Sequence, residues 1–358
     1  MNSIYIHIPF CDNLCNYCDF TKVLNYKNFV RNYLDMLESE IVQIYQNESI
    51  KTLYIGGGTP SAMSITELDK LFEIIDCFNL SSDCEITFEM NIESTTEEKL
   101  NLLYKNGVNR VSFGVQTFNN KLLKELNRFH SGESAVAIIE CAKKIGFKNI
   151  NIDLMFNLPN QTIENLENDL KVFKSLEISH LSIYSLILEE KSVFGFRNIE
   201  VNYDNFDIWY YKIKDFLEAS NYIHYETSNF AKLGFESKHN LVYWNCQNYY
   251  GFGLGASSYI SNKRCDNTTS ITKYLNGEFV ANCQILSELE LMQEYMFLGL
   301  RKIEGVTFTE FYNIFGKNIF DVFNIDEIDR ELFEISAETI KFSRKGLIYA
   351  NEVLINFI

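Results

Sequence analysis

The sequence predicts an α/β fold, an incomplete (β/α)6 barrel followed by a smaller, mainly helical C-terminal domain. Strand-like and helix-like segments alternate from residue 3 to residue 219, and each pair of consecutive parallel strands needs a helical crossover. Polar residues stand where the strand-like segments end, as they do at the mouth of a β/α barrel. Beyond about residue 221 this alternation stops.

Composition and spacing identify the individual elements. Residues 3–8 are rich in isoleucine, while apolar residues between 28 and 46 recur at helical spacing. Pro9, Pro60 and Pro159 each follow an apolar run, and proline stops a strand because it has no N–H to donate. We expect strands at 3–8, 51–55, 85–88, 111–115, 149–156 and 181–188, and helices at 28–46, 65–78, 95–105, 133–145, 163–176 and 206–219.

We place the boundary between the two domains after residue 222. Residues 1–222 would form the barrel and residues 223–358 the C-terminal domain. Within the second domain, 289–300 and 309–314 have helical patterns, whereas 347–357 looks rich in β-structure.

Composition narrows the classes of function. The net charge is −16 and there is no dense run of lysine or arginine, so we expect no nucleic-acid partner. We find neither an apolar run of membrane-spanning length nor a signal peptide, and we expect a cytoplasmic protein. In a reducing compartment clustered cysteines indicate metal binding or catalysis. Three of the nine cysteines lie within eight residues, and we expect the six scattered ones to be small buried side chains.

Cys11, Cys15 and Cys18 are the candidate ligands of a [4Fe–4S] cluster. They share one short loop after a predicted strand, and such a loop can wrap a cubane and ligate three of its irons. The fourth iron then stays open to an outside ligand. The alternative is a structural zinc ion, but closed zinc sites have four ligands and no fourth cysteine lies nearby.

The flanks of this loop resemble the radical SAM HemN/HemW family. The similarity begins at Tyr5-Ile-His-Ile-Pro-Phe-Cys11 and includes Tyr17, Asp19 and Phe20. It continues at 56–61, 113–118, 126–130 and 153–159, and in the stretches 225–231, 239–244 and 251–259, which match the HemW branch, before ending at 294–301 and 304–306. The resemblance implies a radical SAM barrel that holds a [4Fe–4S] cluster and S-adenosylmethionine (SAM).

Several polar residues at strand ends are candidates for the SAM site. Gly56–Gly58 would let the backbone approach the ligand, although a tight turn is the commoner use of such a run. Glu89 would meet the SAM ammonium or a core cation, Arg128 the SAM carboxylate, and Gln116 and Asp153 either ribose hydroxyls or the start of the next helix. The resemblance assigns Tyr5, Gly57, Gly58, Thr59, Glu89, Gln116, Arg128 and Asp153 to SAM. Tyr17 stands between two cluster cysteines and would either shield the cluster or have an ordinary packing role.

The resemblance leaves two functions open. One is an oxygen-independent coproporphyrinogen III oxidase, an enzyme that decarboxylates propionates through a 5′-deoxyadenosyl radical. The other is a haem chaperone of the HemW type, which binds haem and delivers it to client haemoproteins such as those of a respiratory chain, meeting them at the membrane periphery. The oxidase branch has an extra cysteine where this chain has Phe20, and a longer segment before its cluster motif.

The haem reading also rests on the pattern His239-Asn-x-x-Tyr243-Trp244, which the resemblance associates with haem. A histidine can ligate iron, and the two aromatic residues offer flat apolar surface to a macrocycle. The alternative is a packed loop with a hydrogen-bonded histidine. His7 is a rival ligand, whose simpler role would be to orient the cluster loop through a hydrogen bond.

Overall fold

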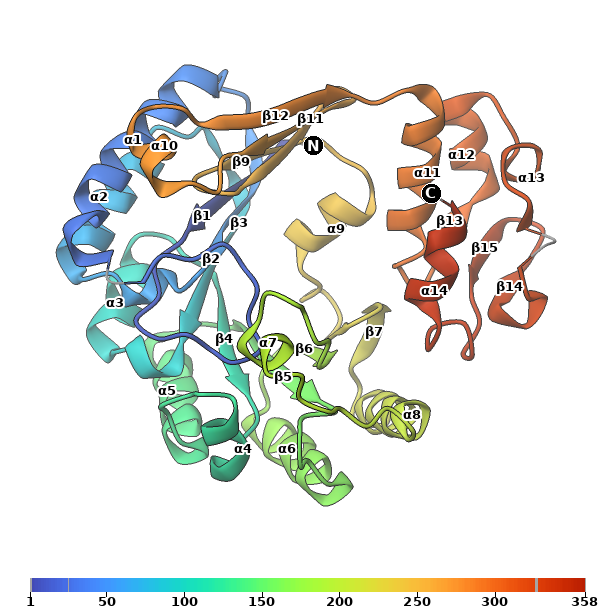
Figure 1. The fold of residues 1–358 in the computed structure, drawn as a ribbon, viewed down its shortest axis with the longest axis horizontal. Helices are drawn as coiled ribbons and strands as arrows, with labels where there is room; N and C mark the ends of the chain where they lie inside the picture. The colour runs from blue at the N-terminus through green and yellow to red at the C-terminus, as the bar shows by residue number, and fades with distance from the viewer. Residues whose placement is uncertain (1, 25, 326–327, 358) are drawn as a thin grey trace.

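The computed structural model describes residues 2–24, 26–325 and 328–357. Six parallel strands form the barrel wall, and the helices between them lie on its outer side (Figure 1). The strands are β1 (Asn2–Ile8), β2 (Ile50–Gly57), β3 (Leu80–Asn91), β4 (Arg110–Gln116), β5 (Asn149–Phe156) and β6 (His180–Ser185). The helices are α1 (Val30–Ile44), α2 (Ile65–Ile75), α3 (Glu97–Lys105), α4 (Asn120–Glu125), α5 (Gly132–Ile145), α6 (Ile163–Leu176), α7 (Val193–Phe196) and α8 (Phe206–Glu218).

The parallel sheet follows the order of the chain from β1 to β6 and is extended at both edges. Beyond β6 lie β8 (Asn229–Ala231) and β7 (Ile223–Glu226), both in antiparallel pairing. Beyond β1 lies β9 (Tyr249–Phe252), which pairs with it in parallel, followed by β10 (Ser257–Ile260), β11 (Lys263–Asn267) and β12 (Val280–Ile285). The predicted α/β barrel fold is therefore confirmed. The boundary after residue 222 stays a prediction, but the hydrogen-bonded sheet continues across it.

Side chains alternate between the two faces of the barrel strands, as strand geometry requires. The apolar set, for example Val111, Phe113 and Val115 of β4, is buried in the core between the sheet and the outer helices. The polar set faces the barrel axis in level rows, since the register places Asn91 beside Gly114, Gly114 beside Asp153, and Asp153 beside Ser182. The barrel interior is consequently polar at its carboxyl end.

The C-terminal part packs mainly helices around a small sheet. It contains α11 (Glu288–Gly299), α12 (Phe308–Phe315), α13 (Ile319–Val322) and α14 (Ala350–Leu354), with β13 (Val306–Thr307), β15 (Thr339–Phe342) and β14 (Phe333–Ile335) in that order. The β-rich prediction for 347–357 was wrong. The buried residues there are Leu347, Ala350, Val353, Leu354 and Phe357, and this spacing of three and four residues is helical.

Two short helices complete the chain between β8 and β12. Helix α9 (Lys238–Trp244) lies between the barrel and the C-terminal helices, against β2 and α11 (Figure 1), and α10 (Ile271–Leu275) follows β11 and contacts α1. Among the described residues, no helix combines the length and the apolar character needed to cross a membrane. The predicted cytoplasmic location stays a prediction.

The scattered cysteines are not uniformly buried, so that expectation was wrong for several of them. Cys77 is exposed, and Cys265 and Cys283 form a disulfide between β11 and β12. The two positions are direct partners in the antiparallel ladder, which brings their side chains to the same face of the sheet edge.

Candidate active site: a cluster loop over a polar cavity

A cavity of about 450 Å³ opens at the carboxyl ends of the barrel strands. That volume lies in the range of small-molecule sites in proteins. Its wall contains Cys11, Cys15 and Cys18 together with these predicted residues: Tyr17, Gly57, Gly58, Thr59, Glu89, Gln116, Arg128 and Asp153. The fold therefore brings the cluster loop and most of the predicted SAM residues to one place.

The three cysteines do not converge on a single ion. Cys11 is buried, while Cys15 and Cys18 are half-buried, and all three are free thiols. Among the residues the structure describes, no group of three cysteine, histidine or acidic side chains is close enough to share one metal ion. A cubane takes one thiolate on each of three irons and needs no such convergence, whereas zinc does. The residues present fit a [4Fe–4S] cluster.

The cluster loop is anchored to the strand that precedes it. Val23 N–H donates to Pro9 O at 2.7 Å and Cys11 N–H to Val23 O at 3.2 Å, so the loop closes on itself. His7 Nε2 lies 2.9 Å from the carbonyl oxygen of Thr21 and must donate to it, while Tyr5 O–H donates to Nδ1 at 3.0 Å. Both ring nitrogens of His7 are thereby occupied, in the loop-orienting role.

The glycines at the end of β2 make room for this loop. A Cβ on Gly58 would lie 2.8 Å from the carbonyl of Pro9 and 3.0 Å from Cys11 Sγ. Gly57 has a φ of +116°, and a Cβ there would meet the ring of His7 at 2.7 Å. The close approach of backbone to loop, and the positive φ, are the reasons for glycine at these positions.

The segment between α4 and α5 holds the loop from the opposite side. Asn127 Nδ2 donates to Leu14 O at 2.6 Å, Asn16 Nδ2 to Glu125 O at 2.7 Å, and Asn16 N–H to Leu126 O at 3.1 Å. Asn127 has a φ of 59°, which asparagine tolerates better than most residues. The motif at 126–130 therefore acts as a clamp on the cluster loop.

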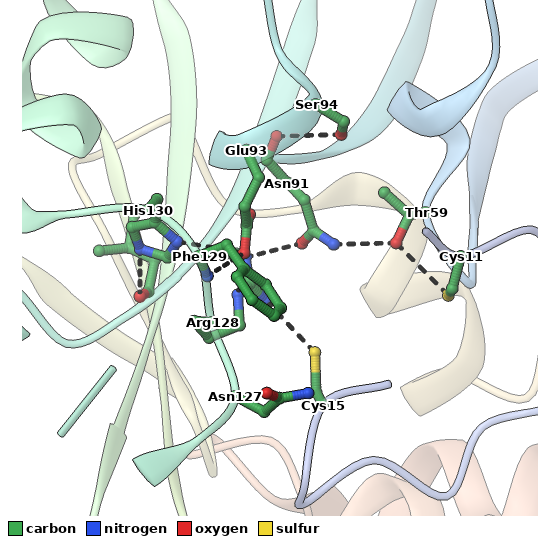
Figure 2. A network of polar contacts seen from close by, with 12 residues as sticks. Cys11, Cys15, Thr59, Asn91, Glu93, Ser94, Asn127, Arg128, Phe129 and His130 are labelled. Carbon is green, nitrogen blue, oxygen red and sulfur yellow. Dashed lines mark hydrogen bonds and ion pairs between the residues drawn. The ribbon is translucent and has the colours of Figure 1, made fainter. Parts of the chain in front are cut away.

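Arg128 is the centre of a buried polar network (Figure 2). Its Nε and Nη2 donate to the two carboxylate oxygens of Glu93 at 2.8 and 2.9 Å, and Nη2 also donates to Gly114 O at 2.7 Å. Only Nη1 points toward the cluster loop, 3.3 Å from Tyr17 Oη and 3.9 Å from Cys15 Sγ. The guanidinium is already paired with a carboxylate, and its role as a clamp on SAM stays a prediction.

Glu93 is the counter-charge of this network. Burial alone would raise its pKa, but His130, whose Nδ1 lies 3.4 Å from Oε1, and the Arg128 charge hold the pKa down at about 2. Phe129 N–H adds a further hydrogen bond at 3.2 Å. The carboxylate is thus ionised throughout the physiological range, and it compensates the buried arginine.

A relay leads from Arg128 to a second cluster cysteine (Figure 2). Arg128 Nη2 donates to Asn91 Oδ1 at 3.0 Å, Asn91 Nδ2 donates to Thr59 Oγ1 at 2.8 Å, and Thr59 Oγ1 lies 3.5 Å from Cys11 Sγ. A thiolate only accepts hydrogen bonds, so a Cys11 that ligates iron leaves Thr59 as the donor. Hydrogen bonds to the sulfurs tune the potential of an iron–sulfur cluster.

Glu89 is the acidic group of the cavity. It accepts hydrogen bonds from Tyr54 O–H at 2.6 Å and from Gly57 N–H at 3.1 Å, which join the ends of β2 and β3. Burial raises its pKa to about 7, and no described residue forms an ion pair with it. A buried carboxylate of this kind fits the ammonium group of an amino-acid ligand.

Gln116 and Asp153 complete the polar wall at the ends of β4 and β5. Asp153 accepts a hydrogen bond from Asn151 at 2.8 Å, and burial raises its pKa. Tyr5 does not line the cavity, because its hydroxyl is turned to His7 on the inner face of β1. The assignment of these individual residues to SAM stays a prediction.

None of the three predicted haem residues lines the cavity; His239 is buried, while Tyr243 and Trp244 are half-buried. His239 of α9 is 1% exposed, and its ring nitrogens contact Thr52 Oγ1 at 2.7 Å and Tyr243 Oη at 2.9 Å. Burial lowers its pKa to about 3. Trp244 lies under the guanidinium of Arg301, 5.5 Å from its ring centre. Haem ligation by His239 therefore needs α9 to move, and it stays a prediction.

Sequence reasoning missed further residues in the cavity wall, among them Tyr54, Asn91, Arg110 and Asn240. The first three stand at alternate positions with candidates for the SAM site: Tyr54 with Gly56, Asn91 with Glu89, and Arg110 with Gln116. The period-two rule could have found them. Nothing in the local sequence could have brought Asn240 of α9 here, because its position depends on how the chain returns to β2.

Comparison with known proteins agrees with this geometry. A model of the radical SAM superfamily matches residues 5–173. The heme chaperone HemW of Lactococcus lactis subsp. lactis (strain IL1403) is 39% identical, with 100% of this chain and 97% of that protein aligned. The heme chaperone HemW of Bacillus subtilis (strain 168) is 38% identical over 100% and 99% of the two chains.

A solved structure shares the whole fold. Coproporphyrinogen III oxidase HemN from Escherichia coli superposes with a TM-score of 0.87 over 99% of this chain and 89% of that one, at 23% identity. At that identity the likeness concerns the fold alone. Membership of the radical SAM superfamily implies a [4Fe–4S] cluster and SAM. With relatives of 38–39% identity along its full length, this chain belongs to the HemW family of radical SAM proteins.

Proposed function

We propose that this protein is a haem chaperone that binds haem and transfers it to client haemoproteins. The single observation that carries the proposal is Phe20 in the cavity wall, two residues after Cys18, at the position where the oxidase branch has a further cysteine. The full-length relatives are named as heme chaperones, which supports the same function.

The mouth of the cavity suits a flat apolar ligand. Phe20 is 66% exposed and Ile187 is 57% exposed, and both side chains line the cavity. Exposed apolar side chains at the rim of a polar cavity are typical of ligand-binding surfaces. Haem and coproporphyrinogen III are both tetrapyrroles, so this surface supports the ligand class and does not choose between the two functions.

The chain's own residues would prepare the site for the cofactors. The clamp at 126–130 and the His7–Thr21 hydrogen bond hold the cluster loop, while Glu89 offers a carboxylate to the SAM ammonium. When bound, the cluster supplies the electron for reductive cleavage of SAM. Client proteins of a respiratory chain would receive the haem, and we propose this partner class from the family alone.

The test compares two ligands on one preparation. Anaerobically reconstituted protein with SAM is titrated with haem and, separately, incubated with coproporphyrinogen III under reducing conditions. We expect saturable haem absorbance at one haem per chain and no protoporphyrinogen. A Cys18→Ala variant controls for products that do not depend on the cluster. If the wild-type protein forms protoporphyrinogen and Cys18→Ala does not, the proposal is overturned in favour of the oxidase.

A further inference from the structure

Arg110 is a buried cation on the wall of the cavity. It is the first residue of β4, beside Thr87 of β3 and Asn149 of β5, and it is 2% exposed. Its position is two residues before Ser112 and four before Gly114, so it belongs to the inward-facing row of β4 that lines the cavity.

The guanidinium of Arg110 has no direct partner in the part of the chain that the structure describes. Its Nε is buried without a hydrogen-bond acceptor, and its charge reaches Glu89 and Asp153 only as a longer-range attraction that opposes the rise in their pKa. The nearby acids have other partners: Glu89 accepts from Tyr54 and Gly57, Asp153 from Asn151, and Glu85 from the His239 N–H. A buried charge without a hydrogen-bonded partner is costly.

Arg128 provides the contrast within the same cavity. That guanidinium makes hydrogen bonds to Glu93, Asn91 and Gly114, so its charge is compensated by the protein. Lys22 likewise donates to the carbonyl oxygens of Cys18 and Phe20. Unlike Arg128 and Lys22, Arg110 has N–H donors for which the described residues of the cavity provide no acceptor.

We propose that Arg110 is the carboxylate-binding residue of the cavity, and that the group it binds belongs to a ligand. The planar fork of a guanidinium matches a carboxylate with two parallel hydrogen bonds. Two ligands of the proposed function carry such a group, SAM through its amino acid and haem through its propionates. The inference rests on that function for the choice of ligands, and on the unpaired guanidinium for the site.

The first measurement is stability without ligand. An Arg110→Met variant removes a buried charge that has no hydrogen-bonded partner and keeps apolar volume, so its urea midpoint should be equal to or higher than that of the wild-type protein. An arginine with a purely structural role would give the opposite result. Arg128→Met is the matched control, since it would leave the buried Glu93 carboxylate unpaired and should lower the midpoint.

The second measurement is affinity, with matched ligands that differ only in the carboxylate. Reconstituted wild-type protein and Arg110→Met are titrated with SAM and with decarboxylated SAM, and with haem and haem dimethyl ester. We expect Arg110→Met to bind either SAM or haem about ten- to a hundredfold more weakly than the wild-type protein does. For the matching ligand without the carboxylate, the wild-type protein and the variant should have equal affinity. The affected pair identifies the source of the carboxylate.

Two results would overturn the inference: a variant less stable than the wild-type protein, or unchanged affinity for both SAM and haem. Failure of the chaperone function has a different signature, because wild-type protein would then not bind haem at all. In that case the titrations with SAM and decarboxylated SAM still show whether Arg110 binds a carboxylate.

Discussion

Arg128 Nη2 donates a hydrogen bond to Asn91 Oδ1 at 3.0 Å, and this contact fixes the orientation of the asparagine amide. An arginine only donates, so the oxygen of the amide must face it and the nitrogen must face Thr59. The polarity of the relay to Cys11 is therefore set by a residue that does not touch that cysteine.

The relay predicts a change in the potential of the cluster. Thr59→Val keeps the shape of the side chain and removes the donor to Cys11, so the reduction potential should become more negative. Thr59→Ser retains the hydroxyl and should stay close to the wild-type value. Spectroelectrochemical titration without SAM measures both, and equal potentials for valine and serine variants would show that the hydroxyl does not act on the cluster.

The pairing of Glu93 with Arg128 predicts a pH-dependent stability. The folded-state pKa of Glu93, about 2, lies below the ordinary value of 4.5. The contribution of the ionised Glu93 to the free energy of unfolding is therefore present above pH 4.5 and is lost as the pH falls toward 2. Glu93→Gln should cost about 3 kcal/mol at neutral pH, and the difference should fall to about half near pH 3. Urea unfolding of the cluster-free proteins measures this, and a difference independent of pH would contradict it.

The raised pKa of Glu89, in contrast to the lowered pKa of Glu93, predicts that the affinity for SAM depends on pH. Because its pKa is raised to about 7, the free protein is partly protonated at neutral pH, whereas a SAM ammonium prefers the ionised carboxylate. SAM affinity should fall by up to about tenfold for each pH unit below 7. The ligand 5′-methylthioadenosine has no ammonium and serves as the control in equilibrium dialysis. The same slope for both ligands would remove Glu89 from the ammonium site.

The buried position of His239 gives a test of the haem ligand. Thr52→Val removes one of its two ring contacts, which frees a nitrogen and loosens α9 against β2. If His239 ligates haem, Thr52→Val should bind haem more readily than the wild-type protein, and His239→Ala should lose or alter the Soret band. Unchanged Soret spectra in both variants, with similar losses of stability, would make the histidine structural.

Local patterns were sufficient to predict the barrel but not its extension. Each strand from β1 to β6 is an apolar run with a helix behind it, whereas β7 to β12 are three to six residues long and acquire their pairing from distant strands. Tyr249 joins β1 only because the chain returns after α9. The cluster loop was visible from spacing, because its ligands are neighbours in sequence.

The contacts of the polar site residues could not be read from the sequence. Arg128 and Arg110 are both arginines that line the cavity, yet only Arg128 has a carboxylate partner, and Glu93 reaches it from another element. His239 looked like a ligand because its motif is polar and aromatic, but Thr52 and Tyr243 use both of its nitrogens. Such partners depend on tertiary packing.

The cluster is the central claim, and metal analysis tests it most directly. Iron, acid-labile sulfide and zinc are measured on anaerobically reconstituted wild-type protein, on Cys11→Ala, Cys15→Ala and Cys18→Ala, and on Cys77→Ala, whose thiol is exposed and outside the loop. We expect about four irons and about four sulfides per chain in the wild-type protein and in Cys77→Ala, with strong loss in the three loop variants. Stoichiometric zinc in a colourless wild-type protein, or iron retained in the loop variants, would contradict the account.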